Sequence, residues 1–105
     1  MKMTKRRPTT PGEILHEEFM VSLELTQEHL AQAIGVARGR INEIVNGKRA
    51  ITVDTAIRLG RFFKMTPQFW LNLQLHVDFW DAENQKAEEY SQIKPHEYSP
   101  SQPTS

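Results

Sequence analysis

With 105 residues, the chain is long enough for one small hydrophobic core and too short for a second. It contains no cysteine, which excludes disulfide bonds and thiolate zinc sites, and no apolar run reaches the roughly 18 residues of a membrane span. Thirteen basic residues balance thirteen acidic ones, and no signal-peptide-like apolar run follows the basic start, so we expect a soluble cytoplasmic protein.

The first helix is predicted to begin after Thr10 and to end near Ser22. In "TPGE", Thr10 can cap the helix, the proline suits its first position, and Glu13 completes a capping box. Leu15 and Phe19 lie one helical turn apart and supply the buried side of this helix.

Two short helices with a tight turn between them are predicted next. The first begins after the capping residue Thr26 and ends at Gly35, a residue type that favours helix C-termini. The second extends from about Arg38 to Asn46 and is stopped by Gly47, although the alanine before it is a poor capping residue.

Two longer helices complete the predicted fold. One covers residues 53–63, and the other begins after the capping residue Thr66, with Pro67 at its first position. The last helix can continue through "LNLQLHVDFWDAENQK" to Lys86, because no helix-breaking residue occurs before Pro95.

The chain is therefore predicted to be all-α, with five helices, no strand and no internal repeat. We expect a flexible N-terminal arm over residues 1–9, a helical domain over residues 10–86, and a flexible tail over residues 87–105. The tail is expected because its Ser-, Pro- and Gln-rich sequence contains few core-forming residues.

The pair of short helices carries the strongest functional signal. In "QEHLAQAIGVARGRINEIVN", residues 27–46, apolar side chains recur where they can pack one helix against the other. Ala31 fits a close helix approach, and Gly35 suits the turn, where a positive φ is least costly for glycine. This pattern predicts a helix-turn-helix whose second helix enters the DNA major groove; a purely structural helix pair is the alternative.

Packing the apolar residues inward leaves a polar face on the second short helix. Arginine matches the acceptors of guanine, asparagine matches the edge of adenine, and Glu43 either accepts from a cytosine amine or orients Arg40. Gly39 lets the backbone approach DNA, unless it is a tolerated surface residue. The candidate base-reading residues are Arg38, Gly39, Arg40, Asn42, Glu43 and Asn46.

Residues beside this face are placed to contact phosphates. Gln27 stands at the start of the first short helix, and Lys48 and Arg49 follow the second. Phosphate contacts fix the register on DNA and give salt-dependent affinity without reading sequence. A solvated charged loop is the alternative for the two basic residues.

The balanced net charge conceals an asymmetry along the chain. Residues 1–64 hold eleven basic and seven acidic side chains, whereas residues 65–105 hold two basic and six acidic. A basic front suits a polyanion and an acidic back suits a different partner, although a random distribution of surface charge gives the same counts.

The last helix carries more apolar residues than one small core can easily cover. Such a surplus favours a homodimer, since two recognition helices can then meet a palindromic operator with half-sites about 34–36 Å apart. Burial of the whole surplus in the chain's own core is the alternative. The predicted dimer-interface residues are Phe69, Trp70, Leu73, Val77 and Trp80.

No motif indicates catalysis, a metal site or a cofactor. In "LHEEFM", the position that needs the second histidine of a zinc protease motif holds Met20. The four histidines lack ligand spacing, and neither a glycine-rich phosphate loop nor a nucleophile motif is present. We therefore predict a protein that is not an enzyme and has no metal or cofactor.

The segments "RPTTPGEILHEEFM", "LTQEHLAQAIGV", "RINEIVNGKRAITVDTAIRLGRFF" and "TPQFWLNLQ" resemble the HigA-type, or VapI-like, antitoxins of the Cro/phage-repressor (XRE) class. The resemblance covers roughly residues 7–90. It implies a phage-repressor-like fold and a dimeric repressor of its own operon that also neutralises a HigB-type, mRNA-cleaving toxin. By this resemblance, Arg38, Arg40 and Asn42 fall on the DNA-reading face, whereas Ala37 replaces the small polar residue common at that cap.

Two alternatives to this combined role stay open. Solitary regulators of the XRE type, which have no cognate toxin, look similar in sequence. A protein-interaction module whose main task is to hold a toxin is the other possibility. The resemblance assigns no toxin-binding residues.

Overall fold

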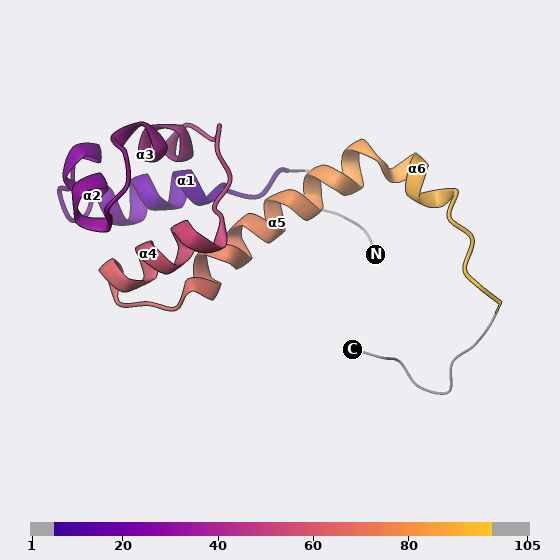
Figure 1. The fold of residues 1–105 in the computed structure, drawn as a ribbon. Coiled ribbons are helices and arrows are strands. Elements are labelled where there is room, and N and C mark those ends of the chain that lie inside the picture. The colour runs from indigo at the N-terminus through magenta and orange to yellow at the C-terminus, as the bar shows by residue number, and fades with distance from the viewer. Residues whose placement is uncertain (1–5, 98–105) are drawn as a thin grey trace.

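The chain forms consecutive helices and no strand over residues 6–97, which the computed structural model describes (Figure 1). α1 and the π-helical η1 follow one another without a break and together form the first predicted helix. The all-α prediction is confirmed, and α6 is an additional helix that was not expected. The segments are α1 (Pro11–Ile14), η1 (Leu15–Met20), α2 (Gln27–Ile34), α3 (Arg38–Val45), α4 (Val53–Phe63), α5 (Pro67–Gln85) and α6 (Ala87–Ser91).

The predicted capping threonines stand at the starts of three helices. Thr10 Oγ1 accepts from the Glu13 amide at 3.1 Å, and Glu13 Oε1 accepts from the Thr10 amide at 2.9 Å, which forms the predicted capping box. Thr26 Oγ1 accepts from the His29 amide at 3.0 Å. Thr66 occupies the N-cap position of α5, but its side chain makes no capping hydrogen bond.

The last long helix ends within one residue of the predicted end at Lys86. α5 ends at Gln85, and Lys86 has a non-helical backbone with φ −125° and ψ 18°. Beyond Val77 no residue of α5 is fully buried, so little packing supports its C-terminal end. α6 then forms within the segment predicted as a tail, whereas residues 1–5 and 98–105 of the predicted arm and tail lie outside the described residues.

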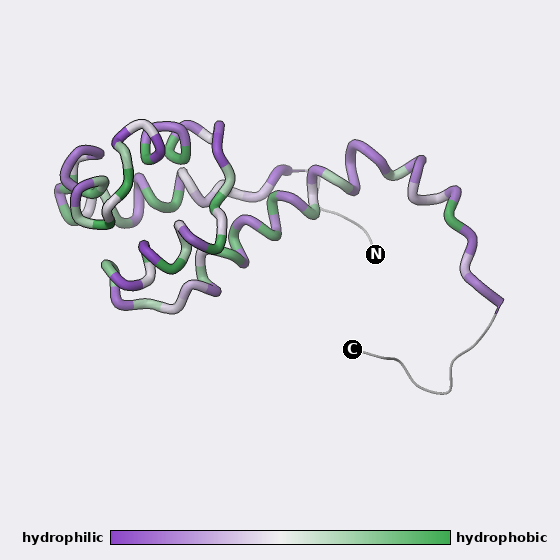
Figure 2. Tube along the Cα trace, viewed as in Figure 1, coloured by the Kyte–Doolittle hydropathy of each residue, from purple (hydrophilic) through white to green (hydrophobic). Residues whose placement is uncertain are grey.

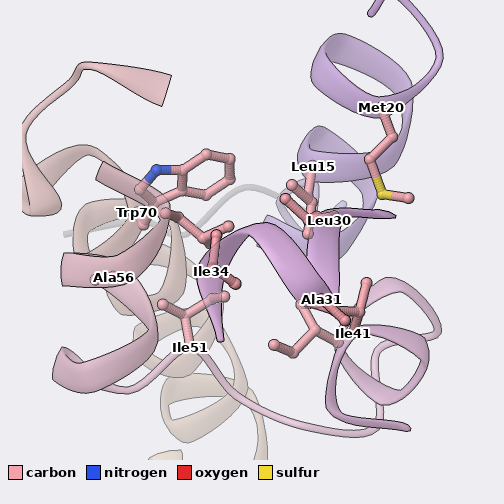
Figure 3. Close-up of a cluster of buried hydrophobic side chains, with 11 residues drawn as sticks. Leu15, Met20, Leu30, Ala31, Ile34, Ile41, Ile51, Ala56 and Trp70 are labelled. Carbon is pink, nitrogen blue, oxygen red and sulfur yellow. The ribbon is translucent and has the colours of Figure 1, made fainter. Parts of the chain in front are cut away.

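One apolar core lies where the first four helices meet the N-terminal half of α5 (Figure 3). Trp70 is completely buried there, with its ring centroid 5.1 Å from that of Phe19. Gly12 lets α1 touch α3, because a Cβ added there would overlap the Ile44 carbonyl. The other buried apolar residues of this core are Leu15, Met20, Leu30, Ala31, Ile34, Ile41, Ile44, Ile51, Ala56 and Leu59.

The C-terminal half of α5 projects away from the core together with α6 (Figures 1 and 2). Arg7, just before α1, reaches this helix: its Nε and Nη2 donate to the two carboxylate oxygens of Asp81 at 2.9 and 2.8 Å. These hydrogen bonds from Arg7 hold the pKa of Asp81 below its ordinary value. Among the helices in the described part of the chain, none has the length and apolarity needed to cross a membrane.

Candidate nucleic-acid interface

α2 and α3 form a helix-turn-helix around a left-handed glycine. Gly35 has φ +75°, and the Val36 amide donates to the Ala31 carbonyl at 3.0 Å. From α4, Arg58 Nη1 donates to the carbonyls of Ile34 and Gly35 at 2.8 and 3.4 Å. Arg58 of α4 therefore caps the end of α2, and the turn is stabilised both by its own backbone hydrogen bond and by α4.

The predicted polar face of α3 lies at the surface. Ile41 and Ile44 are 0% and 1% exposed in the core, which turns the opposite side of the helix outward. All six predicted base-reading residues are thus placed on the accessible part of one helix. Those that are exposed are Arg38, Gly39, Asn42, Glu43 and Asn46, and Arg40 is half-buried.

The N-terminal end of α3 is its most open part. Arg38 makes no hydrogen bond or ion pair with any described residue, and a Cβ added to Gly39 meets nothing within 4 Å. Ala37 provides no side-chain cap, as predicted. Uncapped amides at a helix N-terminus favour contact with anions such as phosphate, so this end of α3 is suited to a close approach to DNA.

Arg40 is already engaged within the chain. Its Nη1 donates to Asp54 Oδ2 at 3.0 Å and to Thr55 Oγ1 at 3.4 Å, both in the first turn of α4. Arg58 Nε donates to the same Asp54 oxygen at 2.9 Å, and hydrogen bonds from Arg58 and then Arg40 lower the pKa of Asp54. Nothing in the local sequence singles out Asp54, because fourteen residues separate it from Arg40.

Two predicted phosphate-contacting residues pair with predicted base-reading residues. Asn42 Nδ2 donates to Gln27 Oε1 at 3.2 Å, and Arg49 Nε donates to Glu43 Oε1 at 2.7 Å. Glu43 therefore orients Arg49. Orientation of Arg40, one of the two roles expected for Glu43, is not what the structure shows. The start of α2 and the loop after α3 are joined to α3 by these contacts.

Asn46 and Lys48 complete this region. Both are exposed and make no side-chain hydrogen bond or ion pair with the part of the chain that is described. Together with the residues above they form a set of polar side chains and one glycine on and beside α3, four of them basic and one acidic, which we call the α3 surface. It comprises Gln27, Arg38, Gly39, Arg40, Asn42, Glu43, Asn46, Lys48 and Arg49.

The five predicted dimer-interface residues divide between the core and the surface of α5. Trp70 and Val77 are 0% and 3% exposed, so they pack inside the chain and offer no surface to a partner, which corrects their expected role. Leu73 and Trp80 are half-buried. Phe69 is exposed, although its ring centroid lies 5.1 Å from that of Trp70.

α5 exposes a different apolar pair, Leu75 and Phe79, which are 59% and 52% exposed. Their spacing of four residues places them on one face of the helix. Apolar residues occur on several sides of α5, so the sequence pattern does not distinguish the buried face from the exposed one. Packing of Trp70 and Val77 against the domain makes that choice.

Comparison with known proteins places the chain in a class. The family described as Helix-turn-helix matches residues 17–70, a range that includes α2, α3 and α4. The fold, the left-handed turn and this match define a helix-turn-helix protein.

Similar proteins identify the family within this class more specifically. The chain is 42% identical over 95 residues to antitoxin HigA-1 of Vibrio cholerae, with 90% of each chain covered. It is 46% identical over 84 residues to an uncharacterized HTH-type transcriptional regulator of Haemophilus influenzae, covering 80% of this chain and 78% of the relative. The solved structure of Pseudomonas aeruginosa antitoxin HigA with the higBA promoter has a TM-score of 0.81 at 39% identity, over 85% of this chain and 98% of that one.

The chain belongs to the HigA antitoxin family of helix-turn-helix proteins, as the sequence resemblance predicted. This is a family of DNA-binding regulators and not of enzymes, which confirms the non-enzymatic prediction.

Proposed function

We propose that the chain is a sequence-specific DNA-binding repressor of its own operon, located in the cytoplasm, that also neutralises a HigB-type, mRNA-cleaving toxin. One observation carries the DNA-binding part. α3 is anchored in the core by Ile41 and Ile44 and presents its polar side, with the uncapped N-terminus, to solvent. The Pseudomonas aeruginosa HigA that was solved with its promoter shares this fold, which supports the proposal.

In the proposed complex, α3 lies in the major groove. Arg38, Asn42 and Asn46 reach base edges, where guanine offers two acceptors to arginine and adenine offers a donor and an acceptor to an amide. The missing side chain of Gly39 lets the backbone of α3 come close to the duplex. Base reading by these residues, with Arg40 and Glu43 beside them, sets the preferred operator.

Phosphate contacts from the same surface add affinity. Gln27 accepts a hydrogen bond from Asn42 in the middle of α3, and Lys48 and Arg49 follow the C-terminal end of that helix, so all three border the helix that is proposed to enter the groove. Each neutralised phosphate releases counterions, so binding weakens as salt rises.

We further propose a homodimer that meets a palindromic operator. The exposed pair Leu75 and Phe79 on α5, with Phe69 nearby in sequence, supplies the apolar surface for the second copy. A two-fold axis then sets two α3 helices about 34–36 Å apart, the spacing of one DNA turn.

The toxin-binding part of the proposal rests on family membership, and no surface is assigned to it. A solitary transcription regulator is the second candidate, because the Haemophilus influenzae relative is named for regulation alone. In that case the chain binds its promoter and no small toxin partner accompanies it.

One experiment tests these functions together. The tagged chain is purified from its native host, and the DNA and polypeptides that accompany it are sequenced. We expect its own promoter, together with a small polypeptide whose association survives high salt. Recovery of the promoter alone favours the solitary regulator, and a gel shift without preference for the promoter over scrambled DNA excludes the repressor.

A further inference from the structure

The carboxylate of Asp54, on α4, is linked by hydrogen bonds to α3 and, through Arg58, to the turn after α2. Asp54 Oδ2 accepts from Arg40 Nη1 at 3.0 Å and from Arg58 Nε at 2.9 Å. Through its Nη1, the same Arg58 donates to the Ile34 carbonyl at the end of α2. Asp54 is thus anchored by the helix-turn-helix itself and in turn holds a side chain of α3.

The hydrogen bonds of Arg40 use one of its three nitrogens. Nη1 donates to Asp54 and to Thr55, whereas Nε and Nη2 donate to none of the described residues. The Arg40 side chain is 32% exposed, so it is partly open to a ligand, and these two nitrogens have no hydrogen-bond partner among the described residues. Two parallel donors on one edge of a guanidinium are what the O6 and N7 acceptors of guanine require.

Fixing an arginine before it binds has an energetic consequence. A long side chain that is ordered only in the complex loses rotamer freedom on binding, and that loss weakens the contact. A carboxylate that already holds one nitrogen of the guanidinium removes part of the loss. The carboxylate also repels phosphate, so it disfavours contacts that are not base-specific.

We propose that Asp54 is a positioning residue for base recognition, which holds Nη1 of Arg40 so that Nε and Nη2 are presented as a pair to a guanine. This inference rests on the proposed DNA-binding function. It assigns to α4, outside the helix-turn-helix, an influence on operator choice that is exerted through Arg40. Arg58 serves the same end by keeping Asp54 in place.

A double-mutant cycle tests the proposal. The parent protein first selects its preferred duplex from a random library, and dissociation constants are measured for that duplex and for a scrambled one. Parent, D54N, R40A and the double variant are compared. We expect D54N to weaken selected-duplex binding about tenfold, to bind scrambled DNA equally or slightly better, and to have little further effect on the affinity ratio in the R40A background.

Matched controls separate this role from charge and from folding. Glu28→Gln removes an exposed acidic charge of α2 that has no partner in the described part of the chain, and it is expected to change the affinity for both duplexes alike. Asp54 is 56% exposed, and thermal unfolding of D54N checks that the domain remains folded. A structural role lowers the melting temperature and both affinities in proportion; that result, or an equal effect of D54N with and without Arg40, overturns the proposal.

A measurement on the unmodified protein gives independent evidence. NMR relaxation of the arginine Nε–H groups in the DNA-free protein compares Arg40 with Arg38, whose side chain has no partner among residues 6–97. We expect Arg40 to be the more ordered of the two, and equal disorder overturns the proposal. If the parent prefers no duplex at all, the DNA-binding function itself fails, which is distinct from failure of the cycle.

Discussion

At the scale of single residues, the α3 surface contains side chains that are engaged and side chains that are not. Arg40, Asn42 and Glu43 have partners within the chain, whereas Arg38 and Lys48 have none among the described residues. A side chain that already has a partner within the chain either keeps that contact while it binds DNA or must give the contact up. Unengaged residues supply charge without that constraint.

Arg40→Ala and Lys48→Ala should weaken DNA binding in different ways. Loss of Arg40 removes a proposed base contact, so we expect about 1–3 kcal/mol of lost affinity for the preferred duplex and a relaxed base preference. Loss of Lys48 removes a phosphate contact, so we expect all sequences to be weakened alike and the salt slope to fall by about 1. Gel shifts at several salt concentrations measure both; parental behaviour in both variants contradicts the assignment of this face.

The contact between Arg7 and Asp81 should respond to acid. Because hydrogen bonds from Arg7 lower the pKa of Asp81, the pair stabilises the folded chain above the ordinary carboxylate range, and this contribution is lost as pH falls through the lowered pKa. An NMR titration of the Asp81 carboxyl should give a low pKa that returns to the ordinary value in Arg7→Gln. An unchanged titration in that variant shows that the arm is not held there in solution.

At the scale of elements, two glycines have different roles: one lies at a contact between two helices, and the other lies on an open helix surface. Gly12 lies against the Ile44 carbonyl, so it brings α1 onto α3 inside the protein. A Cβ added to Gly39 meets nothing within 4 Å, so the backbone of α3 is open to solvent at this position. The first glycine serves the fold, and the second is proposed to serve DNA contact.

Alanine at these two positions separates stability from binding. Gly39→Ala should stabilise the folded chain by about 1 kcal/mol through helix propensity while weakening DNA binding. Gly12→Ala should destabilise it by on the order of 1–3 kcal/mol, because helices α1 and α3 must move apart. Circular-dichroism melting and gel shifts measure the two effects. Parental DNA affinity in Gly39→Ala would mean that the glycine is only a tolerated surface residue.

At the scale of the whole molecule, the basic and acidic parts of the chain lie in different places. The basic N-terminal half forms the domain that carries the α3 surface, whereas the acidic C-terminal residues follow the projecting end of α5 into α6 (Figure 1). A surface for a polyanion is thereby set apart from the acidic end of the molecule.

Leu75→Glu with Phe79→Glu should dissociate the proposed dimer. Two buried acidic groups from each copy are costly in a two-fold apolar interface, so we expect a monomer by light scattering. Affinity for a palindrome should fall, while affinity for one half-site should not. Leu23→Glu, a charge placed at another exposed leucine outside α5, is the matched control and should remain dimeric. A double variant that remains dimeric places the interface elsewhere.

The sequence by itself determined the helices up to α5 and the class of protein. Capping at Thr10 and Thr26 and the turn at Gly35 depend on neighbours a few residues away, so these features were predictable and are confirmed. The spacing of apolar residues along α2 and α3 likewise predicted which side of α3 is buried. These signals can be recognised in the sequence because they depend on residues that are only a few positions apart.

Only the tertiary structure decided which side chains are engaged and which face of α5 is buried. Asp54 meets Arg40 across fourteen residues, and Arg7 meets Asp81 across seventy-four. Trp70 enters the core while Leu75 remains exposed, although both are apolar residues of one helix. Contacts between distant segments depend on how whole helices pack, and no spacing within a single helix encodes that packing.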